Sequence, residues 1–157
     1  ALHRKDGAQA LQSFERYLEK YPQSSERDRV LFGIADAYVG LYKHQDAIKI
    51  YDQIQKESKN PDAVAEAAFR RGDVSFSKGD YKLAEATYAE AIKKHPTYQK
   101  TLPNAQYNLS EARFWQGKYK DSLYSFVEYL KNFPSHEHGG FALARIGELL
   151  QILGADQ

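Results

Sequence analysis

Apolar side chains recur along the chain at spacings of three and four residues, which is the period of one face of an α-helix. A clear example is the run Val30, Leu31, Ile34, Ala35 and Tyr38. A second run follows a short polar connection and contains Ala47, Ile48, Tyr51 and Ile54. No segment shows the strict alternation of a half-buried strand. The pattern predicts helices over residues 5–20, 25–41, 44–57, 61–78, 81–94, 102–116, 119–132 and 138–153.

The helical runs repeat with a fixed period. A small residue followed four positions later by an aromatic one occurs at Ala10/Phe14, Ala47/Tyr51, Ala84/Tyr88 and Ser122/Phe126, in steps of 37, 37 and 38 residues. Two further series share this period: Ala35, Gly72, Ser110 and Gly147, and then Gly79, Gly117 and Gly154. We expect the first of them to mark close helix crossings, with the aromatics filling the adjacent space. A branched residue at Gly72 or Gly147 is then expected to destabilise the protein by about 1–3 kcal/mol.

The repeat resembles the tetratricopeptide repeat family. The resemblance is carried by Gly72, Gly79-Asp80-Tyr81, Ala84, Tyr88, Ala91 and Pro96, and by Leu109, Ser110, Gly117, Tyr119, Phe126 and Pro134. It implies an all-α, right-handed superhelical solenoid of antiparallel helix hairpins, with about four repeats and about eight helices in one domain over residues 1–157. The family's unit is usually 34 residues, shorter than the period found here. Arg71 and Arg113 stand where that pattern has apolar residues, so they must reach solvent or meet a carboxylate.

Within the family, the long period and the Tyr21-Pro22 and Phe133-Pro134 segments are similar to those of a bacterial envelope subgroup. That subgroup includes outer-membrane assembly lipoproteins and periplasmic Tol-associated proteins. The likeness favours a periplasmic or envelope location over the cytoplasm, although similar segments also occur in cytosolic repeats.

Composition narrows the classes of function. The 157 residues hold 22 Lys and Arg against 21 Asp and Glu, a net charge of +1 with both signs mixed, which argues against a nucleic-acid binder. No apolar run is long enough to insert into a membrane. Cysteine is absent, and the five histidines lack the spacing of a helical zinc pair, so we expect no metal site and no cofactor. No nucleophile or phosphate-loop motif is present, and we expect the protein to be non-catalytic.

The first helix of each pair is expected to line a concave groove that binds a protein, as a peptide or a helical segment. The predicted groove residues are Phe32, Asp36, Phe69, Asp73, Phe76, Tyr107, Glu111, Phe114 and Glu148. Repeated exposed aromatics on one surface are typical of a binding site, whereas a tight superhelix would bury them. The four acids favour a ligand that is both apolar and basic. The alternative is that these acids are solvated, or paired with Arg70 and Arg145.

The order of the helices suggests a second role. The chain begins with the second helix of a pair and closes on a first helix rich in apolar residues, namely Ile146, Leu149, Leu150, Ile152 and Leu153. Terminal repeats usually present a polar outer face. We therefore expect a fragment of a longer protein ahead of the alternative, an end that a partner covers. If the C-terminal helix is exposed, we also expect self-association through it. The alternative to a groove-binding scaffold is accordingly a structural spacer or self-assembly module.

Overall fold

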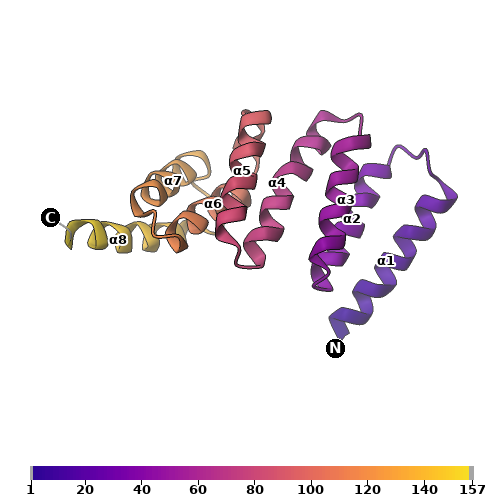
Figure 1. Cartoon of the computed structure of the whole chain (residues 1–157), viewed down its shortest axis with the longest axis horizontal. Coiled ribbons are helices and arrows are strands. Elements are labelled where there is room, and N and C mark those ends of the chain that lie inside the picture. The colour runs from indigo at the N-terminus through magenta and orange to yellow at the C-terminus, as the bar shows by residue number, and fades with distance from the viewer. Residues whose placement is uncertain (1, 156–157) are drawn as a thin grey trace. The chain divides into compact units, whose positions relative to one another are not determined.

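The computed structural model describes residues 2–155, with side chains from residue 7 onward, and these residues are helical almost throughout. The elements are α1 (Leu2–Lys20), α2 (Arg27–Gly40), α3 (His44–Glu57), α4 (Pro61–Ser77), α5 (Tyr81–Lys94), a 3₁₀ helix η1 (Tyr98–Thr101), α6 (Pro103–Trp115), α7 (Tyr119–Asn132) and α8 (Gly139–Ala155) (Figure 1). The described residues contain no strand. The predicted all-α class and its eight helices are confirmed, and only η1 was not expected.

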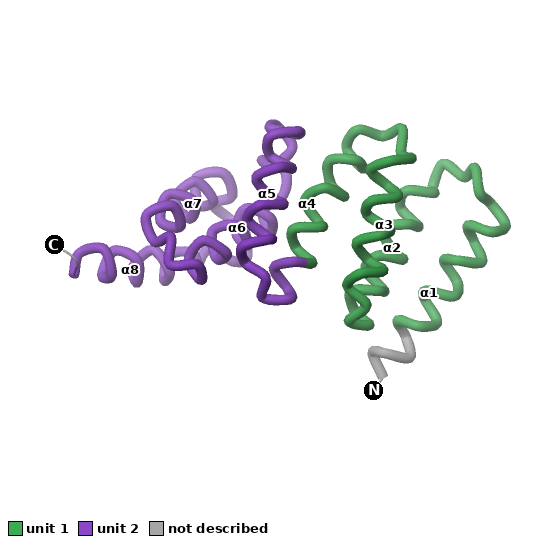
Figure 2. Tube along the Cα trace, viewed as in Figure 1, with its two compact units in different colours: residues 1–74 green, residues 75–157 purple. Residues whose placement is uncertain are grey.

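The chain divides into two compact units, residues 1–74 and residues 75–157, with the boundary inside α4 (Figure 2). In unit 1, α1 packs on α2 and α2 packs on α3. In unit 2, α5 packs on α6, α6 on α7, and α7 on α8. The predictions of a single domain and of a fragment of a longer protein stay predictions.

Each unit has a core built from the predicted repeat positions. In unit 1 the buried cluster includes Leu31, Ile34, Ala35, Ala47, Tyr51 and Ile54. In unit 2 one buried cluster includes Phe114, Phe126, Tyr129, Ala142 and Leu149. Six of the 21 aromatic residues are buried, among them Tyr51 of α3 and Phe126 and Tyr129 of α7, and most of the others are half-buried. Part of the aromatic excess is therefore core material.

The four predicted crossing positions differ in their burial. Ala35 and Ser110 are fully buried, and the buried Ser122 hydroxyl of α7 donates to the Ser110 carbonyl of α6 across 2.9 Å. Gly147 is exposed instead, and a Cβ added there would meet nothing within 4 Å. The predicted crossing at Gly147 is not formed within the described residues, because none of their helices covers that face of α8, so a branched residue there would not overpack a crossing within this chain. Gly72 is buried, as a crossing residue requires, and the expected cost of replacing it stays a prediction.

The turns inside the hairpins share one geometry. Gly79 and Gly117 have φ angles of 75° and 74°, in the left-handed region that glycine tolerates best. Tyr42 holds the equivalent place between α2 and α3 with φ 60°. Tyrosine does not by itself indicate a left-handed backbone conformation, so only the repeat period predicts that the turn at Tyr42 matches those at Gly79 and Gly117.

Candidate functional site

Asp36 and Arg70 form the centre of the predicted surface in unit 1. The Arg70 guanidinium donates to Asp36 Oδ1 across 2.9 Å and to Glu66 Oε1 across 2.8 Å, and it lies 5.3 Å from the centroid of the Phe32 ring. The Tyr51 hydroxyl donates to the same Asp36 oxygen at 3.5 Å. Burial raises the pKa of Asp36, and the positive charge of Arg70 opposes that rise. Asp36 is thus already paired with an arginine.

Glu111 and Arg145 repeat this arrangement in unit 2 with better geometry. Arg145 donates through Nε and Nη2 to the two oxygens of Glu111 across 3.0 and 3.1 Å, and through Nη1 to Glu148 across 2.6 Å. A two-pronged contact of this kind fits the planar guanidinium and is stronger than a single bond. The Glu111 side chain is only 9% exposed. A buried carboxylate is therefore held by a matched cation.

The two ion pairs occupy equivalent positions of the repeat. In each, the arginine follows its acid by 34 residues, from one first helix to the next. This is the paired alternative that the sequence left open, and it holds for Asp36, Glu111 and Glu148. At these positions the acids do not form an unpaired negative surface.

The predicted row of exposed aromatics is corrected by the structure. Phe69 is 1% exposed and Phe114 is 9% exposed, so both belong to the core. Phe32 and Tyr107 are half-buried. The Tyr107 ring packs edge-on against Phe126 and Tyr129, with centroids 5.7 and 5.5 Å apart. Phe32, Tyr107 and Phe114 are covered in part by rings of the second helices that pack against them.

One aromatic surface does remain in unit 2, and Trp115 is its centre. The Trp115 side chain is among the large apolar residues left exposed, at 56%. Its ring stacks on Tyr81 with centroids 6.1 Å apart and planes inclined by 18°, and its Nε1 donates to Glu111 across 3.1 Å. Arg145 lies 3.9 Å from the Phe114 ring centroid and 5.6 Å from that of Trp115. We call this set, completed by Phe76 against Tyr81, the Trp115 surface.

The Trp115 surface joins predicted and unpredicted residues. Phe76, Glu111 and Phe114 were expected in the groove, and the structure brings them together. Trp115, Tyr81 and Arg145 are not among the predicted site residues. The signal that could have found Trp115 is that it is the single tryptophan of the chain and stands at the last position of a first helix.

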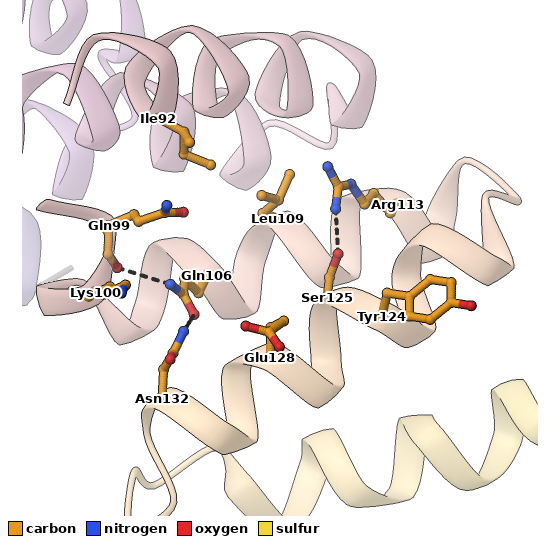
Figure 3. Close-up of a pocket in the computed structure, with 10 residues that line it drawn as sticks. All are labelled: Ile92, Gln99, Lys100, Gln106, Leu109, Arg113, Tyr124, Ser125, Glu128 and Asn132. Atoms are coloured by element: carbon orange, nitrogen blue, oxygen red, sulfur yellow. Dashed lines mark hydrogen bonds between the residues drawn. The ribbon is translucent and has the colours of Figure 1, made fainter. Parts of the chain in front are cut away.

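A separate pocket of about 290 Å³ lies in unit 2 between α5, η1, α6 and α7 (Figure 3). Its lining comprises Ile92, Gln99, Lys100, Gln106, Leu109, Arg113, Tyr124, Ser125, Glu128 and Asn132. Gln106 donates to the Gln99 carbonyl and accepts from Asn132, while Arg113 donates to Ser125. Figure 3 shows these polar side chains directed at one another along the wall. Gln106, Asn132, Arg113 and Ser125 are thus already hydrogen-bonded to one another or to the backbone of the wall.

The two arginines that depart from the apolar pattern both meet carboxylates, as expected. Arg71 lies 3.1 Å from Asp52, and Arg113 lies 3.1 Å from Glu85. Glu85 also accepts from Lys118 and Gln116. Burial would raise the pKa of Glu85, but the hydrogen bonds from Lys118, Gln116 and Arg113 lower it below its ordinary value. These residues are therefore bound into structural ion pairs.

Known protein families match most of this chain. Two family models, both described as tetratricopeptide repeat, match residues 28–99 and residues 1–24 together with 104–136. The chain belongs to the tetratricopeptide repeat family. In its described part no helix has the length and apolar character needed to cross a membrane, and no three His, Asp or Glu side chains are grouped so that they could hold a metal ion.

Solved structures share the tetratricopeptide fold at low sequence identity. A crystal structure of MamA matches with a TM-score of 0.71 and 17% identity, covering 96% of this chain and 80% of that one. PlcR of Bacillus thuringiensis, in complex with the peptide PapR7 and DNA, matches with a TM-score of 0.73 and 15% identity over 98% and 59% of the two chains. A Rap protein complexed with Competence and Sporulation Factor matches with a TM-score of 0.71 and 19% identity over 99% and 50%.

The connections between helices show where this repeat is longer than the usual 34-residue tetratricopeptide unit. The connections within the hairpins, at residues 41–43, 78–80 and 116–118, are uniformly short. Those between hairpins vary, and the one between α5 and α6 is long enough to hold η1. The length therefore varies between hairpins, where it leaves the close helix crossings undisturbed.

Proposed function

We propose that this chain is a non-catalytic scaffold that binds a segment of another protein, and that the Trp115 surface is a centre of that contact. The observation that supports it most is the half-exposed Trp115 ring, held in place by Tyr81 and Glu111. Tryptophan, tyrosine and arginine are the residue types that dominate binding energy at protein interfaces. A preorganised aromatic ring also loses little conformational freedom on binding.

The ligand we propose is a peptide or helical segment with an apolar or aromatic anchor and a basic residue beside it. The anchor would contact the exposed part of the Trp115 side chain, while the basic residue would approach Glu148, whose side chain is half exposed. Because Arg145 already neutralises much of this acidity, the anchor would supply most of the affinity. Two proteins that share the fold, PlcR and a Rap protein, have been solved with PapR7 and Competence and Sporulation Factor, which supports a binding role for this chain.

The single tryptophan makes the proposal directly testable. A peptide library is selected on the purified chain, and the enriched peptides are titrated while the emission of Trp115 is recorded. We expect the emission to shift on binding, and the Trp115→Ala variant to lose at least tenfold in affinity by calorimetry. Tyr124→Ala is the matched control, because Tyr124 is equally an exposed aromatic of unit 2 but lines the pocket of Figure 3 instead.

Two outcomes would contradict this assignment. Selected peptides that bind Trp115→Ala as tightly as the parent chain would remove the Trp115 surface from the interaction. A loss confined to Tyr124→Ala would place the ligand in the pocket between α6 and α7.

A further inference from the structure

α8 carries an apolar face that no described residue covers. Leu143 and Leu150 are 62% and 57% exposed, and Gly147 between them faces open space. Spacings of four and three residues place all three on one side of the helix. Leu149, in contrast, is fully buried in the core of unit 2. α8 thus uses one side for its own unit and leaves a second apolar side open.

The repeat shows which kind of helix fits this face. Leu143, Gly147 and Leu150 are the counterparts of Leu31, Ala35 and Tyr38 in α2. There Leu31 and Ala35 are buried in the cluster that also holds Ala47 and Tyr51 of α3. In α6 the counterpart of Gly147 is Ser110, which accepts from Ser122 of α7. In both units this face is covered by a second helix that presents a small residue and, four positions later, an aromatic one.

α1 is also the second helix of a hairpin by its sequence pattern, and its apolar side is only partly covered. Ala10 and Phe14 carry the same small and aromatic signature. Their counterparts Ala47 and Tyr51 are buried, yet Ala10 and Phe14 are only half-buried, although α1 packs on α2. Tyr17, the counterpart of the buried Ile54, is half-buried as well. The side of α1 that would meet a preceding first helix is therefore not filled.

We propose that a second copy of this chain binds head to tail, with α1 of one copy lying on α8 of the other as the second helix of an intermolecular hairpin. Ala10 would cross at Gly147, as Ser122 crosses at Ser110, and Phe14 would fill the space beside it. The contact joins two different surfaces, so each copy keeps one free end and further copies can add. It is independent of the Trp115 surface, which uses other residues.

Complementary variants test this arrangement. Leu143→Glu with Leu150→Glu blocks the α8 face, and Ala10→Glu with Ser13→Glu blocks the α1 face through positions that are half-buried or exposed. Because both changes add negative charge, the two blocked faces repel each other in a mixture. Molar mass is measured by light scattering and sedimentation over a range of concentrations, and circular dichroism confirms that each variant is folded. The parent chain is expected to grow beyond a dimer, while each variant alone is monomeric. A mixture of the two variants is expected to form a dimer that grows no further.

The same measurements include outcomes that overturn the proposal. Association of the α1 variant with itself would indicate an α8–α8 contact, and association of the α8 variant with itself would show that the α8 face is not used. A parent chain that stays monomeric at millimolar concentration, or a mixture that does not dimerise, would also overturn it. Tyr124→Glu with Val127→Glu, two exposed positions on α7, is the charge-matched control and is expected to associate like the parent. The Trp115→Ala variant should associate normally, so failure here is distinct from failure of the ligand proposal.

Discussion

Tyr42 adopts a left-handed backbone conformation at the one hairpin turn where the repeat does not supply glycine. For a residue with a Cβ this conformation costs roughly 1–2 kcal/mol. We expect Tyr42→Gly to raise the free energy of unfolding by about 1 kcal/mol, measured by urea denaturation. Tyr42→Ala removes the same ring but keeps the Cβ, so it should not be stabilising. Equal effects of the two changes would show that the Tyr42 ring, and not its backbone, decides stability here.

Tyr51 makes unit 1 sensitive to alkali. Burial and the neighbouring Asp36 carboxylate raise the pKa of its phenol to about 12, against an ordinary value of 10.0. Between these values the unfolded chain loses the proton and the folded chain keeps it. Stability therefore falls as the pH rises above 10, by about 1 kcal/mol at pH 11.

Tyr51→Phe should remove this part of the alkaline loss. Phenylalanine is the natural residue at the equivalent positions 14 and 126, and the hydrogen bond of the Tyr51 hydroxyl to Asp36 is long, at 3.5 Å. We expect nearly parental stability at pH 7 and a smaller decrease between pH 7 and pH 11 in urea denaturation. Some decrease should remain, because burial also raises the pKa of Tyr129 and Tyr107. An unchanged decrease would contradict the role of Tyr51.

Neighbouring first helices are joined by one ion pair in each unit, and the two pairs differ in burial. The Glu111 side chain is 9% exposed, whereas that of Asp36 is 57% exposed. Removing the partner of a buried carboxylate leaves an uncompensated charge, while an exposed pair contributes little. We expect Arg145→Ala to destabilise by about 3 kcal/mol and the equivalent Arg70→Ala by about 1 kcal/mol or less, both measured by urea denaturation.

A double variant separates the ion pair from simple packing. Arg145→Leu with Glu111→Leu removes both charges of the buried pair, and it should recover much of the stability lost in Arg145→Ala because no unpaired carboxylate remains buried. Failure to recover would indicate that contact of Arg145 with the Phe114 ring matters more than its charge. Similar losses in Arg70→Ala and Arg145→Ala would show that burial does not set the strength of these pairs.

At the scale of the whole molecule, the described contacts are mainly between helices that follow one another along the chain. In such arrays each repeat is stabilised chiefly by its neighbours, so local damage need not spread. Ala47→Leu overpacks the fully buried α2–α3 crossing in unit 1, at a cost of about 1–3 kcal/mol. We expect hydrogen exchange, followed by mass spectrometry, to lose protection in α2 and α3 far more than in α6 and α7. A uniform loss along the chain would show a single cooperative unit.

The sequence by itself determined the helices, their order and most of the core. A strict period makes equivalent positions visible, so Ala47, Tyr51, Ser122 and Phe126 could be recognised as buried before any coordinates were considered. The all-α class follows from the same period, because a helical hairpin that repeats can bury its apolar side only against its neighbours. The family was indicated by the residues that resemble its consensus, such as Gly79-Asp80-Tyr81 and Pro96.

Tertiary structure decided which of these equivalent positions reach solvent and what they contact. The period treats Phe69 and Tyr107 as alike, yet one is buried and the other half-buried, since exposure depends on side chains from other helices. It likewise treats Asp36 and Glu111 as alike, but only Glu111 meets a two-pronged arginine in a buried setting. The Trp115 surface was not visible in the pattern because it joins residues of α4, α5, α6 and α8 through contacts between residues as many as 34 positions apart. Periodicity predicts which residues are equivalent, whereas the packing of neighbouring helices sets their exposure and their partners.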